Sequence, residues 1–347
     1  MNKSPLLLTT LFVATLGTAL AQEPVGPTYD RARQAPVFTL YIENDYFGGT
    51  DRHYTNGAKL SWISGDLSGW GRSGGQQAAL ERVPLVNDPG TMKNFGFAFG
   101  QNIYTPRDQD LVIPDPSDRP YAGWSYLEFS LLSKTPHQLD IISLQVGMVG
   151  PHSYAKEVQN TFHDWIRNSP SRGWDSQLHD EVGVNLIFER RWRVFARVFD
   201  GALGFDFVPH VGASLGNVAT YANVGASTRL GFNLPNDFGV DLIRGAGVVN
   251  TPVDDNDPRL GERGSLSLFV FGGADGRAVA RDLFLDGNTF RDSPSVDKEY
   301  FVADISVGAG LVIRRWQLTY THVLRTREFK GQDKPNRFGS ITLSRTF

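Results

Sequence analysis

A polar cluster between two strand-like runs stands out near the start of the chain, because its residue types are those of a reactive site. Residues 41–62 read YIENDYFGGTDRHYTNGAKLSW and hold carboxylates, amides, an imidazole and hydroxyls. A tight turn between strands needs glycines such as Gly48 and Gly49 and few other special residues. It does not need Asn44 and Asp45 before the turn and Thr55 after it. This surplus predicts a functional site at the hairpin.

A second polar set lies later in the chain, in the run EVQNTFH. His163 follows Gln159 by four positions and Asn160 by three, so the three side chains are neighbours if the run is helical. An imidazole can act as a general base near neutral pH. The spacing leaves open the alternative that His163 is a solvated helix histidine.

The amino-terminal segment predicts export. Lys3 gives a positive start, residues 6–20 are apolar, and residues 19–21 fit a small-residue cleavage site. We therefore expect a signal peptide at 1–21 and one domain at 22–347. The 34 Lys and Arg nearly balance 37 Asp and Glu, and there is no cysteine. Composition thus excludes a disulfide framework and gives no sign of a nucleic-acid partner.

Strand periodicity indicates a membrane barrel. In residues 301–313, one face is apolar and the other is rich in Asp, Ser and Gly. The same alternation follows residues 58–62, 316–321 and 340–347, and the chain has 37 Gly and 23 Phe. Apolar residues facing lipid and polar residues facing a lumen are typical of outer-membrane barrels. The alternative is a secreted β-sandwich. We predict an all-β fold, a twelve-stranded antiparallel transmembrane β-barrel in the bacterial outer membrane.

The twelve predicted strands lie at 37–47, 54–64, 93–103, 121–133, 138–150, 179–190, 203–217, 220–232, 264–284, 299–313, 315–326 and 337–347. An even count places both ends of the barrel chain on the periplasmic side. The ninth strand contains Gly272, Gly273 and Gly276, which leaves open two strands or one strand with a bulge, and we keep it as one strand because splitting it would make the count odd. The inner connections 65–92, 191–202 and 233–263 are long, although inner turns are normally short.

One outer loop, 151–178, is predicted to hold a short helix at 154–168. Its apolar residues recur at spacings of three and four, and they are Ala155, Val158, Phe162, Trp165 and Ile166. Pro151 and Ser153 lie where a helix begins, and Pro170 lies past its end. We expect the apolar stripe to be buried against the barrel rim or the lipid interface.

Strand phase separates the two hairpin residues. Asn44 is in phase with the apolar residues Phe38, Leu40 and Ile42, whereas Asp45 is in phase with the polar face. An amide on a lipid face is costly unless something covers it, and the loop helix is a candidate cover. The alternative for both residues is ordinary turn chemistry.

Other motifs are weaker. The chain has no H-E-x-x-H run. His53 is a second histidine candidate, but loop histidines are usually solvated. The run DPSDRPYAGW, residues 115–124, is a further polar cluster, in which an ion pair between Asp118 and Arg119 is favoured over catalysis.

Four runs together carry a family resemblance. ENDYFGGTDRHYTNGAKLSW, NIYTPRD, DRPYAGW and EVQNTFH, in this order before a terminal Phe347, resemble the outer-membrane lipid A 3-O-deacylases. The resemblance covers the whole mature chain. It implies a calcium-dependent ester hydrolase that removes the 3'-linked acyloxyacyl group of lipid A, with its site between the barrel wall and a helix in an outer loop.

The resemblance also assigns residues. Asn44, Asp45, Thr55 and His163 match the family's catalytic residues, with His163 as the base, Ca²⁺ as the cofactor and Asp45 as the carboxylate near the metal. Arg107, Arg119 and Gln159 are candidates for substrate binding. Two positions depart from the pattern, because Leu111 stands where the family has a lysine and Ser169 where it has a glutamate.

Two classes of function are therefore carried forward. The first is an esterase acting on lipid A or lipopolysaccharide, which we expect to be monomeric. The second is a non-catalytic barrel, either a pore or an envelope scaffold. A barrel phospholipase shares the chemistry of the first and differs in its substrate.

Overall fold

The computed structural model describes residues 30–48, 53–67, 90–166, 169–199, 203–244, 251–261 and 266–347. The predicted signal peptide lies outside these residues, as do Gly49 and most of the 65–92 connection. The strands are β1 Val37–Asn44, β2 His53–Ile63, β3 Met92–Thr105, β4 Ala122–Lys134, β5 Gln138–Val149, β6 Glu181–Trp192, β7 Phe195–Phe199, β8 Leu203–Gly216, β9 Ala219–Phe232, β10 Leu266–Asp282, β11 Phe301–Ile313, β12 Trp316–Arg325 and β13 Asn336–Thr346.

The helical elements are short. They are α1 Asp30–Arg33, α3 Ala155–Ile166, α4 Leu283–Asp286 and the 3-10 turns η1 Asp45–Gly48, η2 Pro151–Ser153, η3 Trp174–Ser176 and η4 Pro258–Leu260. Among the described residues, no helix is long and apolar enough to cross a membrane.

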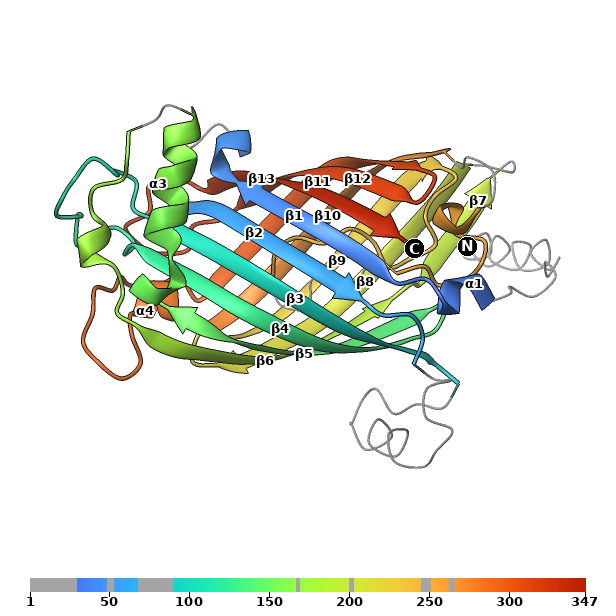
Figure 1. Cartoon of the computed structure of the whole chain (residues 1–347), viewed down its shortest axis with the longest axis horizontal. Helices are drawn as coiled ribbons and strands as arrows, with labels where there is room; N and C mark the ends of the chain where they lie inside the picture. Colours follow the sequence, from blue (N-terminus) through green and yellow to red (C-terminus); the bar gives the residue numbers. More distant parts are fainter. Residues whose placement is uncertain are drawn as a thin grey trace, which may run out of the picture.

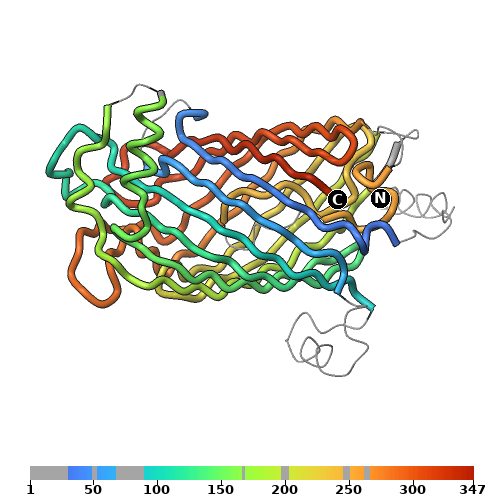
Figure 2. Tube along the Cα trace, in the orientation of Figure 1, coloured from blue at the N-terminus to red at the C-terminus, as the bar shows by residue number. Residues whose placement is uncertain are grey.

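Twelve strands form a closed antiparallel barrel, as predicted. Strands β1 to β6 pair in sequence order, as do β8 to β13. The circle is completed by the pairing of β1 with β13 and of β6 with β8. Val37 at the start of β1 faces Thr346 at the end of β13, so the barrel chain begins and ends at one rim. Figures 1 and 2 show α3 at the opposite rim, here called the outer end.

The thirteenth strand, β7, was not predicted. It lies in the segment 191–202, which the sequence analysis assigned to a connection, and it pairs with the inner end of β8. It forms a short hairpin with the start of β8 at the inner rim and leaves the twelve-stranded closure unchanged. Its pairing partners, Leu203 to Phe207, begin β8 before that strand reaches β6.

Side chains alternate between lipid and lumen as the sequence predicted. On β1, Phe38, Leu40 and Ile42 are exposed on the outside, while Thr39, Tyr41 and Glu43 are buried. A β-sandwich would bury its apolar faces between two sheets, so that alternative is wrong. The ninth predicted strand is the single strand β10, and its register shift lies between Val279 and Arg281 rather than at the glycines.

The long connection between β9 and β10 enters the barrel and plugs its inner half. Phe238 and Val253 of this segment pack with lumen-facing residues of five strands in one apolar core: Ile63, Leu132, Leu139, Ile141, Ile187 and Val208. The Ile243 N–H reaches as far as Glu43, donating to Oε1 at 2.7 Å. This burial explains why the inner connection is long.

Ion pairs fix the plug to the wall. Asp241 Oδ1 lies 2.7 Å from Arg191 Nη2, and Arg244 Nη1 lies 3.2 Å from Asp275 Oδ1. The Lys134 ammonium donates to the Pro252 carbonyl at 2.8 Å. Buried charges are costly unless paired, and here the plug supplies the partners.

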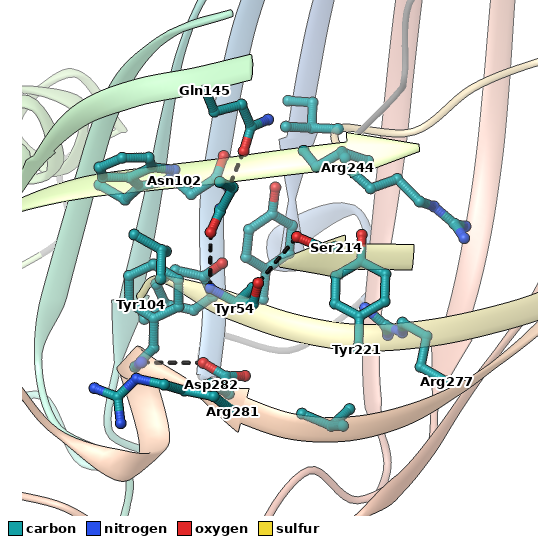
Figure 3. Close-up of a pocket in the computed structure, with 18 of the residues that line it drawn as sticks. Tyr54, Asn102, Tyr104, Gln145, Ser214, Tyr221, Arg244, Arg277, Arg281 and Asp282 are labelled. Atoms are coloured by element: carbon teal, nitrogen blue, oxygen red, sulfur yellow. Dashed lines mark hydrogen bonds between the residues drawn. The ribbon is translucent and has the colours of Figure 1, made fainter. Parts of the chain in front are cut away.

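Between the plug and the outer rim the lumen keeps a cavity of about 130 Å³. Figure 3 shows its polar and aromatic lining, which includes Tyr54, Tyr104 and Tyr221 from the wall and Arg244 from the plug. The lumen is thus occupied by side chains and plug along much of its length.

Candidate active site

The helix that carries the candidate base lies on the outside of the barrel wall. Helix α3 packs on β3 and β4 at the outer end (Figure 1). Ile103 of β3 is in phase with the exposed Phe97 and Phe99, yet it is buried in a cluster with Ala155 and Trp174. The helix therefore covers a part of the wall that lipid would otherwise reach.

The side of α3 that packs on the barrel is mostly polar. Ala155, Gln159 and His163 form the buried stripe, at a spacing of four residues. Val158 and Trp165 are exposed, so the first of the two predicted positions for the apolar stripe, packing on the barrel rim, is wrong, and the lipid interface stays a prediction. Of the predicted apolar stripe, only Ala155 is fully buried among the side chains that the structure describes. The helix thus turns polar groups toward the barrel.

Hydrogen bonds among neutral side chains hold this polar stripe in place. Gln159 Nε2 donates to Gln109 Oε1 at 2.8 Å, and Ser171 Oγ donates to the same oxygen at 2.6 Å. Trp174 Nε1 donates to Gln159 Oε1 at 3.0 Å. Gln159 was a candidate for substrate binding, but here its amide joins α3 to two outer loops.

His163 is buried and oriented. Its side chain is 4% exposed, so the alternative of a solvated helix histidine is wrong. Nδ1 lies 2.7 Å from the carbonyl oxygen of Ser169. A carbonyl only accepts hydrogen bonds, so Nδ1–H donates and the neutral ring keeps Nε2 unprotonated. An unprotonated Nε2 is the form that a general base requires.

The barrel wall beside the helix carries polar groups on its lipid-facing side. Thr55 sits at the register shift between Tyr54 and Asn56, and its hydroxyl is 2.6 Å from that of Thr105 on β3. Further along, Gln101 Nε2 donates to the Ser153 carbonyl at 2.7 Å. Polar side chains on a lipid face are costly, and these are buried or half-buried by the loops above them.

Asn44 and Asp45 stand at the same outer end. Asn44 ends β1 opposite Asn56 of β2, is buried on the lipid-facing side as its phase predicted, and accepts the Tyr46 N–H at 2.8 Å. The phase argument for Asp45 is wrong, because the strand ends before it and Asp45 begins η1, where it is buried. Strands β1, β2 and β3 are neighbours, so Asn44 and Thr55 lie within two strands of the wall under α3.

The two candidate arginines are both paired. Arg107 is exposed, and its guanidinium pairs with Asp333. Arg119 is fully buried, stacks over the Tyr104 ring at 4.7 Å and lies 3.3 Å from Glu328 Oε2. The predicted ion pair between Asp118 and Arg119 is therefore wrong, because the guanidinium of Arg119 pairs with Glu328. These contacts give Arg119 a structural role. Its guanidinium could bind a phosphate only after breaking its contacts with Tyr104 and Glu328.

The turn that carries these arginines is ordered by local hydrogen bonds. Asp118 accepts the backbone N–H groups of Arg107 and Arg119 at 2.7 and 2.8 Å. The Ser117 hydroxyl, and then its backbone N–H, donate to Asp115 and hold the pKa of that carboxyl below its usual range.

The described residues do not form a ready metal site. No group of three or more His, Asp or Glu side chains in that part of the chain is placed to hold a metal ion. Ca²⁺ takes six to eight oxygen ligands, whereas the four assigned residues offer one carboxylate, that of Asp45, and the Asn44 and Thr55 oxygens are already hydrogen-bonded. The donor set does not fit calcium by itself.

Several residues of the site escaped the sequence analysis. Gln109 and Ser171 lie in loops without periodicity, so no pattern marks their meeting with Gln159. His53, expected to be solvated, is buried with its ring edge-to-face on Phe329 at 5.6 Å and its Nδ1 3.8 Å from Asp118.

A closed twelve-stranded barrel with an apolar outer belt and a covered polar patch at one rim defines an outer-membrane β-barrel protein. The family model for outer membrane protein LpxR matches residues 6–347, and the chain belongs to this family. Its localisation is therefore the outer membrane.

One solved structure agrees with the fold. LpxR from Salmonella typhimurium is 19% identical, with a TM-score of 0.70 over 90% of this chain and all of that one. The β-domain of the Bordetella autotransporter BrkA is 8% identical with a TM-score of 0.43 over 90% of this chain and 99% of that one. A comparison with curated protein sequences gives no match.

Proposed function

We propose that the protein hydrolyses the 3'-linked acyloxyacyl ester of lipid A in the outer leaflet, with His163 as general base. The observation that carries this proposal is the buried imidazole of His163, oriented by the Ser169 carbonyl on a helix that packs against the outside of β3 and β4. A buried base next to membrane lipid suits an ester that is itself anchored in the membrane. Membership of the LpxR family supports the same reaction class.

In the proposed reaction, Nε2 of His163 takes a proton from water, and the resulting hydroxide attacks the ester carbonyl. The tetrahedral intermediate then expels the sugar oxygen, which takes the proton back from His163. A free sugar hydroxyl and a fatty acid are left. The roles of Asn44, Asp45 and Thr55 are to bind and polarise the ester at the rim.

Calcium dependence is a proposal of its own, with Asp45 as the one carboxylate near the metal. A chelator series followed by return of Ca²⁺ tests it. Full activity after chelation contradicts the calcium proposal and leaves the His163 proposal standing.

The direct test is mass spectrometry of lipid A from cells that express the wild type or His163→Ala. We expect loss of the 3'-linked acyl group with the wild type and an unchanged acyl pattern with His163→Ala. His137→Ala, in an exposed inner turn, is the matched control and is expected to act as the wild type does. An unchanged pattern with the wild type, with calcium present, contradicts the proposal. Release of fatty acid from phospholipid instead identifies a barrel phospholipase.

A further inference from the structure

An exposed apolar stripe runs along the outward side of α3, next to the buried polar stripe. Val158 and Trp165 belong to it, and Tyr154 precedes it at the start of the helix. Trp165 is 81% exposed, which is a high value for the largest apolar side chain. Folding of the barrel does not account for this exposure, since the helix already packs through Ala155, Gln159 and His163.

A second apolar group lies at the tip of the 106–120 loop. Leu111, Val112 and Ile113 are consecutive and exposed, Val112 to 54% and Ile113 to 82%. They stand between polar runs, with Asp110 before and Asp115 after. Three exposed apolar residues in a row, in an otherwise polar loop, mark a binding surface.

The loop tip and the helix are held together. The Gln109 side chain bonds Gln159 of α3, and the Gln109 carbonyl accepts the Arg172 N–H at 2.9 Å. A Cβ at Gly173 would lie 3.0 Å from the Leu111 carbonyl oxygen, so the tip lies close against the loop that follows α3. The two apolar groups therefore belong to one side of the outer rim.

This side continues the lipid-facing belt of the wall. On β3 and β4 the exposed pairs Phe97–Phe129 and Phe99–Leu127 lead outward to Gln101 and Ser125, where the η2 turn begins to cover the wall. From there the outward surface passes onto α3. In an outer-membrane barrel, what faces an apolar belt is acyl chain.

We propose that Leu111–Ile113 and the Tyr154, Val158 and Trp165 side chains insert among the acyl chains of the outer leaflet and receive the substrate from the membrane by its chains. The capture of substrate rests on the proposed function, whereas the insertion of these side chains into the leaflet does not. The site is then fed sideways from the leaflet, and its preference is set by acyl chains more than by phosphate. This fits a loop whose Arg107 is already paired with Asp333.

The first experiment measures insertion without turnover. The tryptophan fluorescence of the wild type and of Trp165→Phe is recorded in vesicles of lipid A and phospholipid. The difference between the two spectra isolates the emission of Trp165 from that of the other tryptophans, since the chain has seven. We expect quenching by acyl-brominated lipid and protection from aqueous iodide. The Trp316→Phe difference is the control, because Trp316 is exposed on the wall itself. Quenching of Trp165 by iodide alone overturns the proposal and indicates a surface for a soluble partner.

The second experiment measures substrate capture. Val112→Asp with Ile113→Asp is expected to lower kcat/KM on lipid A in vesicles by about tenfold, because charge near the membrane interface is penalised, and to spare hydrolysis of a dispersed short-chain ester. Val194→Asp, exposed on the inner side, is the matched control. Equal losses on both substrates overturn the capture step. If the wild type cleaves neither substrate, the proposed function fails while the quenching result still decides insertion.

Discussion

At the scale of single residues, a backbone carbonyl orients the candidate base. Because the Ser169 carbonyl accepts from Nδ1 of His163, the Ser169 side chain is dispensable. We predict that Ser169→Ala keeps the rate and the pH profile of lipid A hydrolysis. Nitrogen-15 spectra of labelled histidine, assigned with His163→Gln, are expected to show the Nδ1–H tautomer for the neutral ring. A proton on Nε2 contradicts both the orientation and the base role.

A buried lumen pair gives a residue-scale test of stability. Lys59 Nζ and Glu128 Oε2 lie 2.9 Å apart and both side chains are fully buried. Lys59→Met leaves the carboxylate without its cation, which costs about 3 kcal/mol. We expect a lower urea midpoint for unfolding from lipid vesicles, and recovery of most of the loss in Lys59→Met with Glu128→Met. No change in the single variant contradicts the argument.

At the scale of elements, the position of α3 depends on the Gln109 amide. Gln109→Leu removes the acceptor for Gln159 and Ser171 at once. We predict activity lower by roughly 30-fold, since two partly buried hydrogen bonds are lost at about 1 kcal/mol each, and faster proteolysis near α3. Gln138→Leu, on β5 at the inner end, serves as the control. An equal loss of barrel stability in both variants contradicts a local clamp.

The elements themselves were largely predictable. Strand alternation locates all twelve barrel strands because lipid and lumen demand opposite side chains, and the spacing of Ala155 to Ile166 locates α3. The same spacing left open whether the apolar stripe faces the barrel rim or the lipid interface. A helix on a membrane protein has apolar surroundings on its outside, so Val158 and Trp165 are stable there while His163 turns inward.

The assembly of the site was less predictable. The alternation of β1 predicts that Asn44 lies on the lipid-facing side. It does not predict that the strand ends before Asp45, nor that Arg119 pairs with Glu328, because both depend on how the loops pack in the folded protein. The meeting of Gln109 with Gln159 joins residues fifty positions apart. Hydrogen bonds between irregular segments leave no period in the sequence.

At the scale of the whole molecule, the plug decides what the barrel can do. Twelve strands enclose a lumen that side chains alone fill incompletely. The segment after β9 fills its inner half through Phe238 and Val253, and a cavity of about 130 Å³ lies between this segment and the outer rim. The sequence showed a long inner connection but not its position, since its residues carry no strand or helix period. This filling argues against the pore alternative and leaves the chemistry to the outer wall.

Conductance follows from the same geometry. We predict that the wild type, reconstituted in planar bilayers, shows no steady ion current. Replacing residues 236–258 by a short turn removes Phe238, Asp241 and Arg244, and with them the contacts that fill the lumen, so discrete open levels are expected if the variant still folds as a heat-modifiable barrel. Lipid A hydrolysis depends on the outside of the wall, so we expect the variant to keep more of its hydrolytic activity than of its resistance to ion flow. Steady current through the wild type, with no ester hydrolysis, would instead establish the pore, because a plugged lumen cannot pass ions while the plug stays in place.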